Sequence, residues 1–307
     1  MKKLREALID YLSLRRSLGF KLNSDGRSLL AFVSFLETQG AEYISTQLAA
    51  EWCLHGSAQP ITKVRKLCYV RGFAKYLTTI DPRTEIPSQD LITAKSRRAR
   101  PYLYTDDEIQ RLMAAALDLD PVNGLRHLTY HYLLGLIAVT GMRISEAINL
   151  KVDDADLDAG ILTVRGTKFG KSRLVPLHAT TRDALRTYKT VRDQTAKEGP
   201  EATTLFISSR CKPLNYRVVN KTFDSMCRQI GIRGQKQDRA PRIHDLRHRM
   251  AVKTLLCWYR KGDNPERRLP ALATYLGHVH VGDTYWYLTA CPELMEEAVK
   301  RLEQRGR

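Results

Sequence analysis

Residues 242–248 read Arg242-Ile243-His244-Asp245-Leu246-Arg247-His248, and the other suggestive residues of the chain make most sense as groups that converge on this stretch. It places an imidazole and a guanidinium three residues apart, so on a helix His244 and Arg247 share one face. A group that can transfer a proton, beside a fixed two-pronged cation, suits chemistry on a phosphate. Because His244, Asp245 and His248 could instead hold a metal ion at helical spacing, the stretch alone leaves both interpretations open.

The length and the charge of the chain limit the classes of protein to which it can belong. At 307 residues it is longer than a usual single core, so we expect two domains. The formal net charge of +17, from 50 Lys and Arg against 33 Asp and Glu, exceeds what solubility requires and predicts a polyanionic partner. Nucleic acid is the first candidate, and an anionic membrane surface is the second.

The cysteines and the N-terminal stretch argue against other classes of protein. Six cysteines are scattered without a C-x-x-C pair, which indicates reduced thiols in a cytosolic protein rather than a zinc site or a disulfide framework. Charged residues interrupt the apolar stretch from Leu4 to Leu14, so we expect no targeting segment and no transmembrane span. We therefore expect a cytoplasmic protein without a bound metal.

The first 95 residues show the spacing of a compact all-α domain. Apolar residues keep helical spacing in four segments, which begin near Leu4, Ser24, Thr46 and Pro60. The last of these segments also carries five basic residues, namely Lys63, Arg65, Lys66, Arg71 and Lys75. A solvated helix face is the ordinary explanation of such residues. In a chain this basic, we interpret them as contacts to nucleic-acid phosphates.

A polar, charged connector follows at residues 96–103. Its composition disfavours a helix, and Arg97, Arg98 and Arg100 within it could lie along a nucleic-acid backbone. Thr105 and Glu108 then have the spacing of a capping box, which predicts a new helix. We place the second domain at residues 104–307.

The second domain is predicted to be mainly α-helical with a small β-hairpin. An apolar helix ends at a glycine, and Arg143 directly after it would be held on rigid structure and face a pocket. Strands are expected at residues 161–165 and 173–177, joined by a turn that carries Lys168 and Lys171. Helices are also expected at 179–195, 215–230 and 244–260, with a short strand at 204–207 and a terminal amphipathic helix from Pro292.

Five short segments of this domain occur in a specific order. Residues 140–146 read Thr-Gly-Met-Arg-Ile-Ser-Glu, residues 166–177 form the lysine-bearing hairpin, and residues 244–248 contain an H-x-x-R pattern. Leu276-Gly277-His278 follows, and Tyr287 lies nine residues after His278. In this order the segments resemble the first arginine box, the β-hairpin lysine segment, the H-x-x-R box, the L-G-H box and the terminal nucleophile of the tyrosine recombinase, or phage integrase, family.

The resemblance implies covalent chemistry on a phosphodiester. Arg143 and Arg247 would stabilise the negative charge that grows in the pentacoordinate transition state. Tyr287 would attack the phosphorus and leave a 3′-phosphotyrosine and a free 5′ hydroxyl, so the energy of the bond is kept and no nucleotide cofactor is needed. A phenol with a pKa of about 10 requires activation by a nearby base and a positive field.

The family resemblance also implies roles for the remaining polar residues. His244 would accept the proton of the phenol, and His278 would hydrogen-bond a phosphate oxygen. The leaving 5′ oxygen would take its proton from Lys168, with Lys171 as the alternative. Glu146 resembles a buried acidic residue that orients the arginine box.

The sequence departs from the family pattern at three places. The interval between Arg247 and His278 is longer than usual, which implies an extended loop or an added helix. Tyr285 lies close to Tyr287, and only the spacing from His278 selects the latter. Arg249 stands where the family often has a small or uncharged residue. We interpret three further basic residues of the domain as DNA contacts, namely Lys171, Arg173 and Arg249.

The resemblance implies a site-specific recombinase that integrates, excises, transposes or resolves DNA, for a mobile element or a host chromosome. Its partner would be double-stranded DNA with paired inverted half-sites, which residues 1–95 would grip from the opposite face. Four copies would assemble on two synapsed duplexes, because four strands must be cut. In free solution the protein would be a monomer, and in the cell it would associate with the nucleoid and not with a membrane. The helix at about 292–305 would pass to a neighbouring copy or pack on its own domain.

Three other functions stay open at this point. A type IB topoisomerase-like enzyme would use the same chemistry without a partner strand. A DNA-binding protein that no longer catalyses would have no need of the full set of polar residues. A metal-dependent hydrolase would use His244, Asp245 and His248, and its activity would be lost in chelator.

Overall fold

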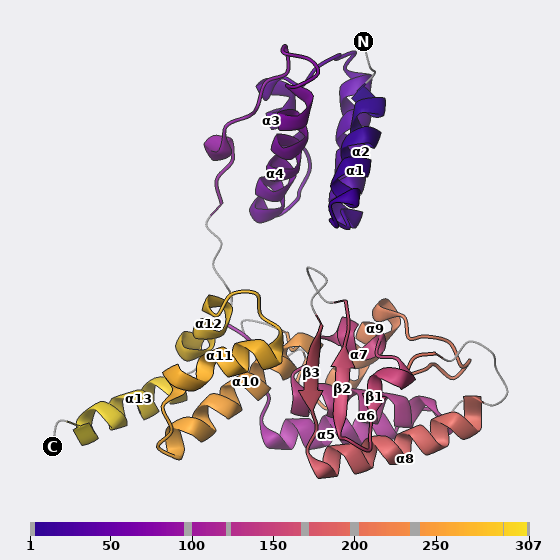
Figure 1. Cartoon of the computed structure of the whole chain (residues 1–307), viewed down its shortest axis with the longest axis vertical. Helices are drawn as coiled ribbons and strands as arrows, with labels where there is room; N and C mark the ends of the chain where they lie inside the picture. Colours follow the sequence, from indigo (N-terminus) through magenta and orange to yellow (C-terminus); the bar gives the residue numbers. More distant parts are fainter. Residues whose placement is uncertain are drawn as a thin grey trace. The chain divides into compact units, whose positions relative to one another are not determined.

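The computed structural model describes residues 4–94, 100–120, 124–166, 172–196, 203–233, 240–290 and 292–305. The chain divides into two compact units, residues 1–99 and 100–307, whose elements are labelled in Figure 1. The division lies inside the stretch 96–103 that the sequence suggested as a connector. Within the described ranges, no helix combines the length and the apolar character that crossing a membrane requires.

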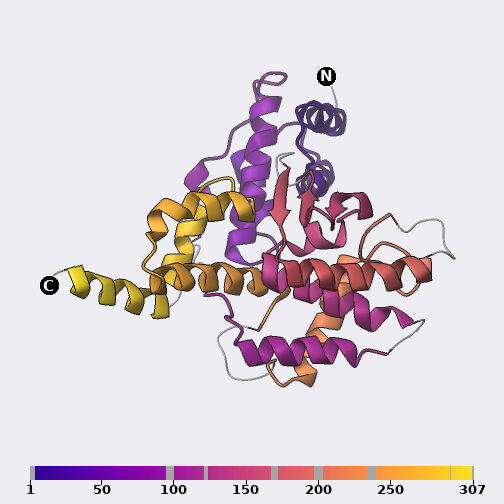
Figure 2. The same ribbon diagram turned by 60° about the horizontal axis from the view of Figure 1, so that its bottom comes forward.

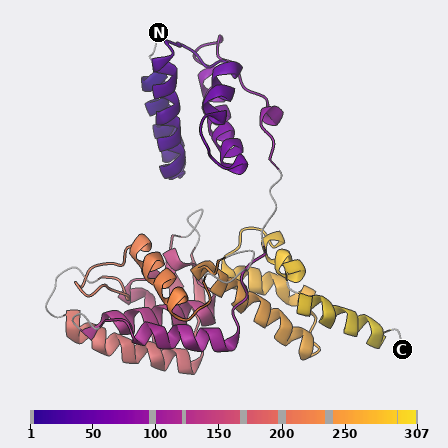
Figure 3. The same ribbon diagram turned by 180° about the vertical axis from the view of Figure 1, so that it is seen from behind.

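The described part of the first unit contains four helices, seen from behind in Figure 3: α1 (Leu4–Ser17), α2 (Asn23–Thr38), α3 (Thr46–Leu54) and α4 (Pro60–Leu77). A short 3₁₀ turn, η1, follows at Gln89–Leu91. On α2, Leu29, Phe32 and Leu36 recur at helical spacing and are buried in the core that all four helices share. The four helices predicted from the apolar spacing are thereby confirmed.

The second unit opens with three helices, α5 (Asp106–Leu117), α6 (Arg126–Thr140) and α7 (Ile144–Ile148). The predicted capping box at the start of α5 is present, since Thr105 Oγ1 accepts the Glu108 N–H at 3.1 Å and the Glu108 carboxylate accepts the Thr105 N–H at 2.8 Å. Gly141 ends α6 in the left-handed region at φ +64°, a conformation that suits glycine. The chain therefore turns sharply and places Arg143 at the first residue before α7.

A small antiparallel sheet follows in the order β1-β2-β3, formed by Ala155–Asp156, Ile161–Val164 and Arg173–Pro176. The short 3₁₀ turn η3 (Val152–Asp154) leads into it. In the hairpin, Leu162 pairs with Val175 and Val164 with Arg173, and the buried side chains of β2 alternate with half-buried ones. The strand predicted at 204–207 is wrong, because Thr204 and Ile207 form only isolated bridges with Lys151 and Pro213.

Six helices complete the described part of the unit: α8 (Ala179–Ala196), α9 (Tyr216–Gln229), α10 (Ile243–Arg260), α11 (Pro265–Leu276), α12 (Gly282–Ala290) and α13 (Pro292–Arg305). The long interval before His278 is filled by the rest of α10 and by α11. Figure 2 shows α10, α11 and α12 gathered on one side of the unit and the sheet on the other. This arrangement brings the ends of α7, α10, α11 and β3 together.

The terminal helix α13 packs on α10 of its own chain. Leu294 is 2% exposed and belongs to a small core with Leu255, Leu272 and Tyr287. Met295 and Val299 on the same helix are about half exposed. The helix predicted from residue 292 is thus present, and its passage to a neighbouring copy stays a prediction.

Candidate active site

The first turn of helix α10 is capped by Asp245, the third residue of the helix. The Asp245 carboxylate accepts the backbone N–H of Arg242 at 3.0 Å and its guanidinium at 2.9 Å, which satisfies a donor that the helix leaves unpaired. Asp245 is fully buried, so it anchors the start of the helix and holds the next turn firmly. Arg247 on that turn is 1% exposed and donates to the Gly141 carbonyl at 2.8 Å.

Three arginines from different elements donate to three consecutive carbonyl oxygens at the end of α11. The pairs are Arg173 Nε with Tyr275 at 2.8 Å, Arg247 Nη2 with Leu276 at 2.6 Å, and Arg143 Nη2 with Gly277 at 3.0 Å. The last carbonyls of a helix have no acceptor role inside it and carry the negative end of the helix dipole. Cations are therefore favourable here, and the end of α11 gathers three guanidinium groups.

The carboxylate of Glu146 joins two of these arginines. It accepts Arg143 Nη1 at 2.8 Å and the two Arg173 terminal nitrogens at 3.0 and 2.7 Å, and it also caps the Arg143 backbone N–H at 2.9 Å. Burial by itself raises the pKa of Glu146, but the hydrogen bonds and charge of Arg173, followed by those of Arg143, outweigh it and hold the pKa at about 2. Glu146 therefore stays charged at neutral pH and fixes both guanidinium groups.

Arg173 and Arg249, two of the predicted DNA contacts, have partners within the second unit, and their contacts with DNA stay predictions. The Arg173 side chain is 8% exposed and is engaged by Glu146 and the end of α11. The Arg249 side chain is 12% exposed, donates to the Tyr104 carbonyl at 2.9 Å and pairs with Asp106. Both guanidinium groups thus hold the second unit together. The sequence did not reveal this role, because the residue type alone does not show which group a basic side chain contacts in the folded chain.

The other predicted contacts of the basic residues stay predictions. Three of these residues are exposed, namely Arg65, Lys75 and Arg100. Three make contacts within the first unit: Lys63 donates to the Leu54 carbonyl at 2.9 Å, the Lys66 ammonium lies 4.7 Å from the centre of the Trp52 ring, and Arg71 donates to the Pro87 carbonyl. Four lie outside the described residues, namely Arg97, Arg98, Lys168 and Lys171. The general-acid role of Lys168 or Lys171 therefore stays a prediction.

Tyr287 is 2% exposed and lies among aromatic rings. Its ring centre is 5.4 Å from that of His248, 5.6 Å from that of Trp286 and 6.1 Å from that of His278. The ring of His248 is in turn 4.7 Å from that of His244. His248 thus contacts both the predicted base and the predicted nucleophile, and the i, i+4 spacing of the two histidines could have suggested its contact with His244.

The histidine of the L-G-H segment is held by a residue from the next helix. His278 Nδ1 shares a hydrogen bond of 2.7 Å with Thr284 Oγ1, and Thr284 is fully buried. Gly277 just before it has φ +67°, so the chain turns out of α11 at a residue that tolerates this conformation. The structure therefore brings Arg143, Arg247 and His278 to one helix end.

The electrostatics of the site separate a neutral imidazole from charged guanidinium groups. Burial, followed by repulsion from Arg247 and Arg242, lowers the pKa of His244 to about 4, although the residue keeps an exposed face. Burial and the charge of Arg143 lower the pKa of Arg247 to about 10. At neutral pH His244 can therefore accept a proton while Arg247 remains a cation.

We expect the His244 imidazole of the DNA-free protein to titrate near pH 4, well below the ordinary 6.5. The unfolded chain then binds more protons than the folded chain between these values, so the contribution of His244 to stability falls as the pH drops from 6.5 to 4. Proton NMR of the imidazole, assigned by comparison with His244→Gln, measures the midpoint. A midpoint at or above 6.5 would contradict the expectation.

The metal interpretation of His244, Asp245 and His248 fits the geometry poorly. The Asp245 carboxylate accepts from Arg242, and the nearest nitrogen of His248 is 4.0 Å from it. Across the described ranges, no three His, Cys, Asp or Glu side chains are grouped so that they could hold a metal ion. The described cysteines are all free thiols.

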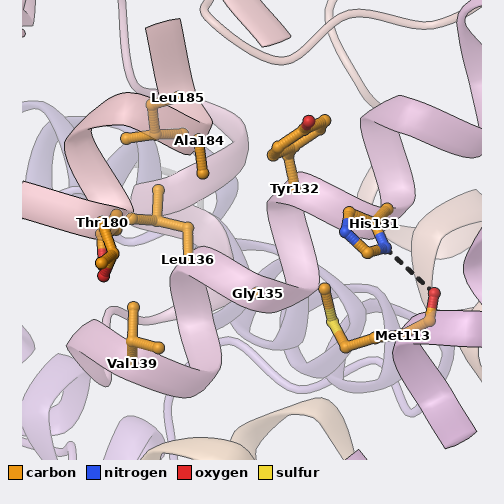
Figure 4. Close-up of a pocket in the computed structure, with 10 residues that line it drawn as sticks. Met113, His131, Tyr132, Gly135, Leu136, Val139, Thr180, Ala184 and Leu185 are labelled. Atoms are coloured by element: carbon orange, nitrogen blue, oxygen red, sulfur yellow. Dashed lines mark hydrogen bonds between the residues drawn. The ribbon is translucent and has the colours of Figure 1, made fainter. Parts of the chain in front are cut away.

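A hollow of about 190 Å³ lies elsewhere in the unit, between α6 and α8 (Figure 4). Leu136 and Val139 of α6 face Ala184 and Leu185 of α8 across it. His131 also lines the hollow, and its imidazole is hydrogen-bonded to the Met113 carbonyl at 3.0 Å. The lining is mostly apolar and includes none of the arginines of the site, so we do not assign the chemistry to this hollow.

Comparison with known proteins gives consistent matches along the chain. The model of the phage integrase family matches residues 103–293. The integrase/recombinase y4rB of Sinorhizobium fredii is 48% identical over 99% of this chain and 98% of its own length. The tyrosine recombinase XerD of Caulobacter vibrioides is 30% identical over 81% of this chain and 77% of its own length.

The fold is also similar to that of a solved structure, the XerH site-specific recombinase bound to its palindromic difH substrate in a post-cleavage complex. The TM-score is 0.67 at 20% sequence identity, over 92% of this chain and 80% of the other. At this level of identity the likeness concerns the fold. It extends the match beyond the residues that the family model covers.

Proposed function

The chain belongs to the phage integrase family and is a tyrosine-type site-specific recombinase, which cleaves and rejoins DNA, and we propose that Tyr287 is its nucleophile. The observation that carries this proposal is the convergence of Arg143, Arg247 and His278 on the end of α11 in the same unit as Tyr287. A phosphodiester repels nucleophiles through its charged oxygens, so a cluster of fixed cations is what its cleavage needs.

Arg143 and Arg247 would bind the non-bridging oxygens of the scissile phosphate. A guanidinium has five N–H groups in a planar fork. The structure uses one N–H of each terminal nitrogen of Arg143 and Arg247 for protein acceptors. The other N–H groups can donate to a phosphate without breaking these bonds, so the cations are oriented before the substrate arrives.

The covalent step balances with the residues at hand. The Tyr287 phenol gives its proton to His244, directly or through a water molecule, and its oxygen forms a bond to phosphorus. The bond from phosphorus to the 5′ oxygen breaks, and that oxygen takes a proton from the hairpin lysine, Lys168 or Lys171. The products are a 3′-phosphotyrosine and a 5′ hydroxyl, and the reverse reaction with another 5′ hydroxyl rejoins the strand.

The proposal extends to the partner and the assembly. Double-stranded DNA with paired inverted half-sites fits a basic chain of two units, in which residues 1–95 supply a second surface for the duplex. Exchange between two duplexes requires four cuts, so four copies would assemble on the synapsed DNA. Met295 and Val299, which α13 leaves half exposed, would contribute to contacts between copies.

A covalent adduct tests the proposed function. The recombination site is first selected from random duplexes by binding, and a nicked duplex carrying that site is then incubated with the protein in chelator. We expect a protein–DNA species that survives denaturation, is linked through phosphotyrosine and forms equally well without divalent metal. Relaxation of any supercoiled plasmid without the selected site would instead favour a topoisomerase-like enzyme.

A further inference from the structure

Arg173 is a buried cation at the start of β3, and it contacts two separate parts of the site. It is the first residue of β3, two residues after the hairpin tip that carries Lys168 and Lys171. Its side chain is 8% exposed, so it is withdrawn from solvent. With its terminal nitrogens on Glu146 and its Nε on the Tyr275 carbonyl, it joins β3 to α7 and to α11.

The first consequence concerns the carboxylate that holds Arg143. Both oxygens of Glu146 accept from Arg173, in the two-pronged geometry that a guanidinium offers and an ammonium does not. Without Arg173, Glu146 would stay buried with a single cationic partner, and its pKa would rise above the value of about 2 that Arg173 helps to maintain. A protonated Glu146 would hold Arg143 less firmly.

The second consequence concerns the turn that precedes His278. A Cβ placed on Gly277 would come within 2.8 Å of Arg173 Nη1 and 3.1 Å of its Cζ, so the guanidinium lies directly against the glycine backbone. The Gly277 carbonyl is at the same time the acceptor of Arg143. Arg173 therefore packs on the turn that sets both the Arg143 guanidinium and the start of the His278 segment.

We propose that Arg173 is a positioning residue of strand cleavage, which locks the start of β3 to Glu146 and to the end of α11 and so holds Arg143 in place. The inference rests on the proposed function, in which Arg143 binds the scissile phosphate. Arg173 itself touches no substrate. Its effect appears in the rate of the covalent step and in the response of that rate to pH, and not in affinity for DNA.

The test compares Arg173→Gln, Arg173→Lys and the wild type in single-turnover adduct formation at saturating protein, from pH 5 to pH 9. We expect Arg173→Gln to slow the step on the order of 10²-fold, with DNA affinity within about threefold of the wild type. On the acid side of the profile, the rate of this variant should begin to fall at a higher pH than that of the wild type. The reason is that Glu146, without Arg173, becomes protonated at a higher pH. Adding Glu146→Gln to Arg173→Gln should remove this added acid dependence.

The conservative variant and a matched control separate positioning from stability. Arg173→Lys keeps a charge beside Glu146, so the acid side of its profile should return to that of the wild type while the rate recovers only in part. Arg192 is another buried arginine, 5% exposed, and it lies away from the site. It donates to the Asp193 carboxylate at 2.5 Å and to the Thr204 carbonyl at 2.9 Å. Arg192→Gln should lower the thermal midpoint and leave the pH profile unchanged.

Three results would overturn the inference. Weaker DNA binding by Arg173→Gln, with a normal rate at saturation, would make Arg173 a DNA contact. The same pH shift in Arg192→Gln would make the effect one of general stability. An unchanged pH profile in both Arg173 variants would separate Arg173 from Glu146. If the wild type itself forms no phosphotyrosine adduct, the proposed function fails instead, so the two failures are distinguishable.

Discussion

Tyr287→Phe is expected to bind its DNA site normally and to form no covalent adduct. The phenyl ring keeps the contacts with His248, Trp286 and His278, so the fold and the arginine cluster stay intact. Only the oxygen that would bond to phosphorus is lost, and removal of a nucleophile in a covalent enzyme costs on the order of 10⁶-fold in rate. Denaturing gels after incubation with the nicked duplex measure the adduct, and gel shifts measure binding.

Tyr285→Phe is the matched control for this variant. Tyr285 lies on the same helix, two residues earlier, and is 47% exposed. Its variant should form the adduct at the wild-type rate. An adduct in Tyr287→Phe that disappears in Tyr285→Phe would move the nucleophile to Tyr285.

Arg247→Lys is expected to reduce the rate of adduct formation on the order of 10³-fold while the positive charge is retained. A lysine cannot reach the Gly141 and Leu276 carbonyls and a phosphate at once, because its ammonium is a single point of donation. Each buried carbonyl left without a donor costs about 1–3 kcal/mol, so the thermal midpoint should fall as well. Single-turnover rates at saturating protein, below that midpoint, isolate the catalytic effect.

The control for Arg247→Lys lies at the other end of α10. Arg260 is largely exposed and only loosely paired, at 3.8 Å, with Glu297. Arg260→Lys should therefore keep both the rate and the thermal midpoint of the wild type. A wild-type rate in Arg247→Lys would show that the positive charge alone suffices, and it would contradict the proposal that Arg247 acts as a two-pronged clamp.

Much of the fold could be predicted because its signals are local. The spacing of apolar residues, the capping box at Thr105 and the glycine at position 141 act within a few residues of chain, and the helices and the hairpin begin and end close to the predicted places. The strand expected at 204–207 failed because an apolar run needs a neighbouring strand to pair with, and the structure offers it only single bridges.

The site was harder to predict where partners are distant. Arg143, Glu146 and Arg247 were identified through short motifs, whereas the burial of Arg173 and Arg249 depends on acceptors that lie more than a hundred residues away along the chain. A basic side chain looks the same in sequence whether it meets a phosphate or a buried carbonyl. Charge composition therefore predicted a polyanionic partner without showing which cations face it.

The end of α11 also bears on when the chain becomes competent during folding. Its three carbonyls meet arginines that are 29, 102 and 134 residues away in sequence. Such contacts close large loops, so the chain loses conformational entropy when they form, and they slow folding compared with local contacts. Until these contacts form, Tyr287 lacks an assembled set of cations, so we expect a partly folded chain to be unable to cleave DNA.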